Sequence, residues 1–264
     1  MDNYKLVKLF SSGSAEENDK KGFTYLNEEG LFLEENNSDK EKNAIPPHYA
    51  DLARLHILIR SRKVFSILEF GLGWSTIVMA DALSKNKKDW EALDSKPLSK
   101  SPKFELHAVD TSEFWIKHTV DKIPGNLQEF ISFHYSKAKI GTFQDRVCHY
   151  YEKLPDITPD FIYLDGPDPA TVEGTLNGIS FSYQNRIVIA ADLLRLEPIL
   201  LPGTMFLVDG RTANVRFLAH HLYRNWKITH DPVGDITVFE LQEPPLGEKQ
   251  RIILKHQQGE SFIE

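Results

Sequence analysis

Four acidic residues stand at, or within one residue of, the ends of apolar runs that have the pattern of buried strands: Glu69, Asp110, Asp165 and Asp209. Parallel strands end at one edge of their sheet, so residues at these ends meet there. Carboxylates at such an edge can accept hydrogen bonds from hydroxyl groups, take up a proton or bind a cation. Each acid alone could be a helix cap or a turn residue. Four in register favour a ligand site.

A glycine-rich turn comes directly after the first of these acids. The run from Val64 to Leu68 predicts a buried strand, and residues 76–83 predict a helix. Gly71 and Gly73 lie between them and let the backbone turn sharply and approach a ligand closely. Ser75 or the residue after it could cap the helix, whose unpaired N–H groups face whatever lies above the turn. An ordinary strand-to-helix turn would also explain two glycines. The glycines therefore indicate a ligand site only in combination with residues further along the chain.

Strands and helices alternate through the middle of the chain. Apolar runs predict five strands and then two more around a turn, at residues 64–68, 104–109, 130–135, 160–165, 204–208, 226–230 and 236–241. Helices are expected at residues 46–63, 76–83, 111–123, 186–200 and 212–225. The segment 146–151 reads as a further extended piece that could pair with the third strand. This order predicts an α/β fold: a doubly wound, mostly parallel sheet of about seven strands with a terminal antiparallel hairpin and helices on both faces.

The segments outside this alternation divide the chain into three parts. Residues 1–45 are expected to form an irregular N-terminal arm with one or two short strands, at Tyr4–Val7 and Leu31–Leu33. Residues 46–242 form the main domain, in which the lysine-rich segment 84–103 is expected to be an inserted surface loop. Residues 243–264 form a polar tail.

Composition excludes several classes of partner. The 264 residues are 41% hydrophobic and 26% charged, with a formal net charge of −7 and no long basic run, so nucleic acid is not an expected partner. The single cysteine, Cys148, excludes an intramolecular disulfide. No apolar stretch is long enough to span a bilayer, and the N-terminus lacks the apolar core of a secretion signal. We expect a cytoplasmic protein without a membrane partner. The sequence leaves open whether the protein forms a homo-oligomer.

The glycine turn and the acids together resemble the class I S-adenosylmethionine-dependent methyltransferases, nearest in motif to the small-molecule O-methyltransferases. The family's first motif, an acid followed by glycines, matches residues 69–75, and its second-strand acid matches Asp110 when residues 84–103 are set aside. A terminal antiparallel hairpin is also typical of that family and not of dehydrogenases. The family often has a third glycine where Ser75 stands. Because S-adenosylmethionine carries no pyrophosphate, the bulkier Trp74 and Ser75 favour this methyl donor over NAD.

The resemblance implies which residues bind the donor. The first motif would lie near the methionine part, and Asp110 would accept hydrogen bonds from the ribose hydroxyls. The adenine contact would be Ser136 or, if the later extended piece is the counterpart, Tyr150. The residues expected to bind S-adenosylmethionine are therefore Glu69, Gly71, Gly73, Trp74, Ser75, Asp110, Thr111, Ser136, Tyr150 and Asp165.

The acids of the fourth and fifth strands are the catalytic candidates. Some O-methyltransferases of this fold hold Mg²⁺ with acids at these two positions, and the ion lowers the pKa of a substrate hydroxyl. Here Arg211 follows Asp209 closely, where a neutral amide is common, and its guanidinium could replace the metal by pairing with the acid or could hold an acidic substrate. We therefore predict catalysis by Asp165, Asp209 and Arg211 without a metal, with Asp165 as the general base. Magnesium remains the alternative.

The expected activity is methyl transfer to an oxygen of a small molecule, such as a sugar or another hydroxylated metabolite. Two alternatives belong to other classes. One is an NAD-dependent or aminopropyl-transferring enzyme on a similar sheet. The other is a non-catalytic interaction protein that keeps the fold, because a fold alone does not name a function.

Overall fold

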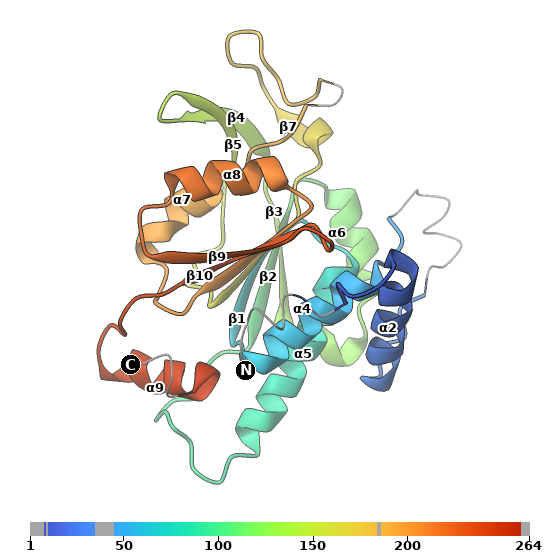
Figure 1. Cartoon of the computed structure of the whole chain (residues 1–264), viewed down its shortest axis with the longest axis vertical. Coiled ribbons are helices and arrows are strands. Elements are labelled where there is room, and N and C mark those ends of the chain that lie inside the picture. The colour runs from blue at the N-terminus through green and yellow to red at the C-terminus, as the bar shows by residue number, and fades with distance from the viewer. Residues whose placement is uncertain (1–7, 9, 35–44, 184–185, 260–264) are drawn as a thin grey trace.

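A seven-stranded sheet organises the chain (Figure 1). The computed structural model describes residues 8, 10–34, 45–183 and 186–259. The strand order is β3-β2-β1-β6-β8-β10-β9; β3, β2, β1, β6 and β8 pair in parallel, whereas β10 is antiparallel to both neighbours. This confirms the predicted fold class. The strands are β1 Ser66–Phe70, β2 Glu105–Asp110, β3 Ile131–Tyr135, β6 Phe161–Leu164, β8 Met205–Asp209, β9 Trp226–Asp231 and β10 Ile236–Leu241.

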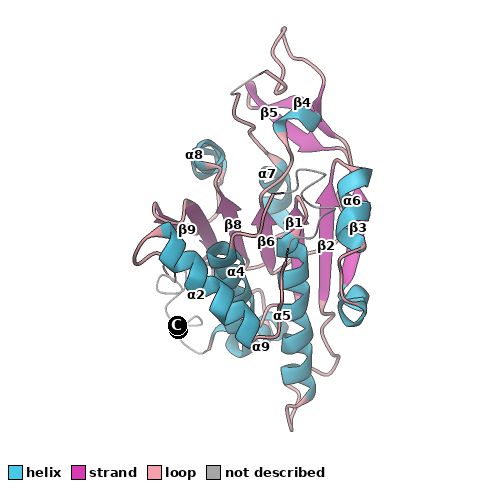
Figure 2. Cartoon of the chain, turned by 90° about the vertical axis from the view of Figure 1, so that its right-hand side faces the viewer, coloured by secondary structure: helices cyan, strands magenta, loops and turns pink. Residues whose placement is uncertain are grey.

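Helices cover both faces of the sheet, and the sheet separates the hydrophobic core into two layers. Alternate residues of a strand point to opposite faces, so Ile67 packs in one layer and Leu68 in the other. The first layer takes in α2 (Ala15–Glu28), α4 (Tyr49–Ser61) and α5 (Trp74–Glu91), which pack against one another (Figure 2). The second takes in α7 (Asp192–Leu196) and α8 (Thr212–His221). Burial on both faces explains why the parallel strands read as continuous apolar runs.

A second, three-stranded sheet lies beyond the carboxyl ends of the large sheet's strands (Figures 1 and 2). Its order is β5-β4-β7, with β4 at Ala138–Phe143, β5 at Arg146–Tyr151 and β7 at Val172–Glu173. The predicted pairing of residues 146–151 with the third strand is therefore wrong, because β5 pairs antiparallel with β4. The main chain reverses between them at Gln144 and Asp145, both with positive φ.

The N-terminal arm holds a long helix, α2, in place of the expected irregular segment. Ser14 and Glu17 form a capping box at its start. Asp19 accepts a hydrogen bond from Ala50 N (3.1 Å) at the start of α4, and a Cβ added to Gly22 would collide with the carbonyl of Tyr49. Leu31 and Leu33 are buried in the core without forming a strand, and Tyr4–Val7 lie outside the described residues. The arm therefore packs firmly against α4.

Two further predictions about helices are wrong. Residues 84–91 continue α5, with Asn86 and Trp90 buried, so a connecting loop begins only after this helix. Within residues 186–200 only the short α7 and the 3₁₀ turn η3 (Glu197–Ile199) are helical; Ala190 instead forms a parallel bridge with His149 of β5. β-branched Ile187, Val188 and Ile189 favour this extended backbone.

Further helical segments lie after β2, before β3 and in the C-terminal tail. Ser112 caps α6 (Glu113–Val120), which follows β2, and the 3₁₀ turn η1 (Gly125–Phe130) precedes β3. The polar tail contains α9 (Glu248–Gln258), whose Gln257 donates to Asp160 Oδ2 (2.5 Å). Among the described residues, no helix combines the length and apolar character needed to cross a membrane.

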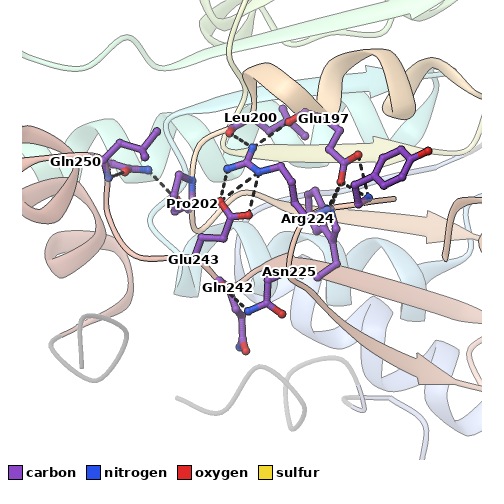
Figure 3. A network of polar contacts seen from close by, with 11 residues as sticks. Glu197, Leu200, Pro202, Arg224, Asn225, Gln242, Glu243 and Gln250 are labelled. Atoms are coloured by element: carbon purple, nitrogen blue, oxygen red, sulfur yellow. Dashed lines mark hydrogen bonds and ion pairs between the residues drawn. The ribbon is translucent and has the colours of Figure 1, made fainter. Parts of the chain in front are cut away.

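A polar network anchors the terminal hairpin to the rest of the molecule (Figure 3). Arg224 binds the Glu243 carboxylate (Nε to Oε1, 3.0 Å) and donates to the carbonyls of Glu197 (2.9 Å) and Leu200 (2.5 Å). The buried Glu197 carboxylate accepts from the indole of Trp226 (2.8 Å). Because these contacts join η3 to β9 and to the segment after β10, they fix the antiparallel hairpin beside β8.

Candidate functional site

The backbone of the glycine turn after β1 is in close contact with the backbone of the loop after β6. Gly71 has a φ of +90°, and its N–H donates to Val109 O (2.9 Å). A Cβ added to Gly166 would lie 2.5 Å from Gly71 N and 2.6 Å from Gly71 Cα, and a Cβ on Gly71 would lie 2.9 Å from Gly166 N. Both positions therefore require glycine. Gly73 differs, because a Cβ there would meet no atom within 4 Å, so space remains open beside the turn.

Glu69 is fully buried and supports the first turn of α5. Its carboxylate accepts hydrogen bonds from Ser75 Oγ (2.5 Å) and Thr76 Oγ1 (2.8 Å), and Thr76 Oγ1 in turn accepts from Gly73 N (3.1 Å). Burial raises the pKa of Glu69 to about 8, against the lowering effect of these two hydroxyls; Asp165 and Asp110 add to the rise. Glu69 and Ser75, both expected to bind the donor, thus bind each other in this structure and shape the turn.

The buried Glu69 carboxyl makes stability depend on pH. Its pKa is about 8 in the folded protein, against 4.5 for an ordinary glutamate, so the folded protein holds this proton over a wider pH range than the unfolded chain. Stability from this group is therefore fully present below about pH 4.5 and falls as pH rises towards 8. We expect Glu69→Gln to remove this fall, so that wild type loses up to about 5 kcal/mol relative to the variant across that range, as an upper limit. Urea unfolding at several pH values from 5 to 8 measures it.

A matched control for this test is Glu91→Gln, because Glu91 is exposed at the far end of the same helix. It should keep the pH dependence of wild type. Parallel stability curves for wild type and Glu69→Gln would contradict the role given to the buried carboxyl.

Asp110 ends β2 beside the glycine turn, and its side chain is partly exposed. Its Oδ1 accepts from Ser112 N (2.7 Å), and burial raises its pKa to about 6 although the N–H groups of Ser112 and Thr111 lower it. Thr111 Oγ1 donates to Thr171 Oγ1 (2.8 Å) and so joins the β2 loop to the β6 loop. The site thus keeps a partly exposed carboxyl where one was predicted.

The acids of the fourth and fifth strands lie close together at the same edge. Tyr163 donates to Asp209 Oδ2 (2.6 Å), and burial raises the pKa of Asp209 to about 7, with Asp51 and Asp165 adding to the rise. The pKa of Asp165 is also raised by surrounding protein and lowered by Arg211. The Asp165 side chain is nevertheless exposed, so it can exchange a proton with a bound ligand. Asp51 comes from α4, an element in which no sequence pattern pointed to a site residue.

Arg211 does not hydrogen-bond to the Asp209 carboxylate. Its Nη2 donates to the carbonyl oxygens of Asp165 and of Pro167 (3.0 Å to the latter) and so braces the loop after β6. The guanidinium still lies close enough to lower the pKa of Asp165. The hydrogen bonds of the described residues do not include the Arg211–Asp209 pair that was considered as a replacement for a metal, although Arg211 lies near both acids. Among the described residues no group of three or more His, Cys, Asp or Glu side chains has the arrangement of a metal site.

Three predicted donor-binding residues are engaged elsewhere. The indole of Trp74 donates to Ile45 O (3.3 Å), and Lys122 Nζ lies 4.1 Å from its ring centre. Ser136 Oγ accepts from Lys153 N (2.9 Å). Tyr150 donates to Thr142 O (3.2 Å), and the guanidinium carbon of Arg195 lies 3.3 Å from its ring centre. The Trp74 contact therefore joins the turn to the segment before α4, whereas the Tyr150 contact joins β5 to β4.

Sequence reasoning missed the residue beside Tyr150. Tyr151 packs its ring against Phe70, the last residue of β1, with ring centres 5.5 Å apart. Successive residues of a strand point to opposite faces, so only one of the two tyrosines can face the edge of the large sheet. That alternation was the available signal, but it required knowing which face of β5 is turned to the site.

Comparison with known proteins gives a likeness of fold. No protein-family model matches the chain, and no curated protein matches it. Among solved structures, the O-methyltransferase TomG from Streptomyces achromogenes, in complex with SAM, is 14% identical, with 87% of this chain and 99% of that chain covered and a TM-score of 0.44. A methyltransferase from Geobacter sulfurreducens is 14% identical over 84% and 98% of the two chains, with a TM-score of 0.46. SAH-bound PaMTH1 from Podospora anserina is 12% identical over 87% and 88%, with a TM-score of 0.44.

Proposed function

We propose that this protein is an S-adenosylmethionine-dependent methyltransferase that acts on an oxygen of a small molecule, such as a sugar or another hydroxylated metabolite. The observation that carries the proposal is the convergence of Asp110, Asp165 and Asp209 on one edge of the sheet, beside a glycine turn with open space at Gly73. The antiparallel β10 supports it, because such a hairpin separates this family from dehydrogenases.

The residues present suit the methyl donor. The partly exposed carboxyl of Asp110 can accept hydrogen bonds from ribose hydroxyls, and the missing side chains at Gly71 and Gly73 leave the turn thin. Trp74 and Ser75, which follow the second glycine, leave less room for the pyrophosphate of a dinucleotide, a group that S-adenosylmethionine lacks. When bound, S-adenosylmethionine supplies an electrophilic methyl group on a sulfonium centre.

The chain's own residues would align the acceptor and move its proton. Asp165 is exposed and lies next to the glycine turn, and its carboxylate accepts no hydrogen bond from the other described residues, so it is the candidate to take the proton of the acceptor hydroxyl. Arg211 holds the loop that carries Asp165, and Asp209 with Tyr163 forms the adjacent polar wall. Alignment of the two reactants is the main contribution expected of the site.

Ligand binding tests the proposal. Thermal unfolding and titration calorimetry with S-adenosylhomocysteine and with NAD separate the donors. At 100 times its Kd, a ligand specific to the folded state adds about 2.7 kcal/mol of stability. We expect S-adenosylhomocysteine to raise the Tm and NAD to leave it unchanged. A rise with NAD alone would favour the dinucleotide enzyme, and no rise with either would favour a non-catalytic protein.

A further inference from the structure

Three neighbouring side chains carry buried polar atoms without a hydrogen-bond partner. Within the described part of the chain, none of the following atoms has a partner: the hydroxyl of Tyr151, both ring nitrogens of His149 and Oδ2 of Asp192. Their residues are 2%, 0% and 1% exposed. We call these three residues the unpaired strip. Most buried polar atoms in folded proteins are paired, and one left unpaired costs about 1–3 kcal/mol. Three together indicate a missing binding partner.

The strip is continuous along β5 and the start of α7. Alternate residues of a strand share a face, so His149 and Tyr151 point to the same side, with ring centres 6.5 Å apart. Asp192 Oδ1 accepts from Tyr151 N (3.0 Å) and thereby fixes the backbone at Tyr151. Phe181, from the connection between β7 and α7, packs on His149 with ring centres 5.8 Å apart. Atoms of the surrounding protein thus cover the strip.

Tyr151 lies at the acidic edge, between the donor acid and the proposed base. Its ring packs on Phe70, and Phe70 pairs with Val109 on one side and Leu164 on the other. Those two residues immediately precede Asp110 and Asp165. Burial raises the pKa of Tyr151 well above its ordinary value; the charges of Asp110, Asp192 and Asp165 add to the rise, and Arg211 lowers it. The hydroxyl therefore stays protonated and can donate a hydrogen bond.

We propose that the Tyr151 hydroxyl is a direct contact of the bound nucleoside donor, beside Asp110, and that Asp192 positions it. This inference rests on the proposed function. The neighbouring Tyr150, one of the two adenine contacts that the sequence left open, donates its hydroxyl to Thr142 O and faces the other side of β5. The donor would supply the hydrogen-bond partner that no described residue gives to the Tyr151 hydroxyl, and the side chains that cover this hydroxyl would move aside.

Calorimetric titration of the full chain with S-adenosylhomocysteine tests this contact. Tyr151→Phe removes only the hydroxyl, and we expect the Kd to rise about 3- to 10-fold, the usual weight of one neutral hydrogen bond. Tyr150→Phe is the matched control, since it removes a hydroxyl one residue away, and its Kd should stay within twofold of wild type. An unchanged Kd for Tyr151→Phe, with wild type binding, would overturn the inference and leave the proposed function standing.

A second measurement separates ligand binding from a structural role. No described residue forms a hydrogen bond with the Tyr151 hydroxyl, so its removal should cost no stability when no ligand is added. The Tm of Tyr151→Phe should then equal or exceed that of wild type. A lower ligand-free Tm together with an unchanged Kd would assign the hydroxyl to an internal water and overturn the proposal. If wild type does not bind S-adenosylhomocysteine at all, the proposed function fails first and this contact fails with it.

Discussion

Asp110→Asn should weaken S-adenosylhomocysteine binding by about 100-fold or more. Two ribose hydroxyls donating to one carboxylate form charge-assisted hydrogen bonds worth about 1.5–3 kcal/mol each. Asparagine keeps an oxygen for Ser112 N, which Asp110 Oδ1 binds at 2.7 Å, so the start of α6 should survive the change. Titration calorimetry at a pH of about 7.5, well above the pKa of this carboxyl, gives the affinity, and ligand-free unfolding confirms that the variant is folded.

Asp168→Asn is a suitable control, because this carboxylate lies close enough to raise the pKa of Asp110. Its Oδ1 binds Ala170 N within its own loop (2.8 Å), so affinity should change less than threefold. The pKa of Asp110 of about 6 adds a second signature: protonation removes an acceptor, so wild-type affinity should fall as the pH drops below about 6. Similar Kd values for wild type and Asp110→Asn would count against a ribose at this carboxylate.

Asp165→Asn should lower kcat by about 10²- to 10⁴-fold, the usual contribution of a general base. The amide is close in size to the carboxylate, and Arg211 binds the backbone carbonyl of residue 165, which the substitution leaves in place. Affinity for S-adenosylhomocysteine should therefore stay within about threefold. The assay follows S-adenosylhomocysteine released when wild type is incubated with S-adenosylmethionine and a panel of sugars and other hydroxylated metabolites.

The parallel variant Asp209→Asn decides which carboxyl takes the proton. If it loses the larger share of kcat while Asp165→Asn stays active, the base is Asp209, whose pKa of about 7 also suits that role. Loss of donor affinity in Asp165→Asn would instead assign Asp165 to binding. Both outcomes contradict the role that we give to Asp165.

The large sheet was predictable because its strands carry long apolar runs that end in turn residues. β1, β2, β3, β6 and β8 all start and end within about two residues of the predicted bounds, and the two strands of the hairpin also match. Burial on both faces makes such runs unmistakable. The four acids followed from the same runs, because the chain direction alone places strand ends at one edge.

Local chemistry explains the features that the sequence did not show. β4 and β5 meet at Gln144-Asp145, with φ of 46° and 62°, whereas Asn-Gly or Asp-Gly usually marks such a turn. The polar residues of 84–91 suggested a loop, but they form the last turns of α5, and Asn86 and Trp90 are buried on one side of this helix. α2 had a readable signal in the capping box of Ser14 and Glu17. Pairing choices such as Arg211 with backbone carbonyls depend on tertiary geometry, which no local pattern encodes.

The backbone contact between Gly71 and Gly166 has a consequence for the geometry of the proposed site. Because main chain lies against main chain, the spacing between the glycine turn and the loop carrying Asp165 does not depend on side-chain rotamers. The proposed base would therefore stay at a fixed distance from the turn that is proposed to hold the donor.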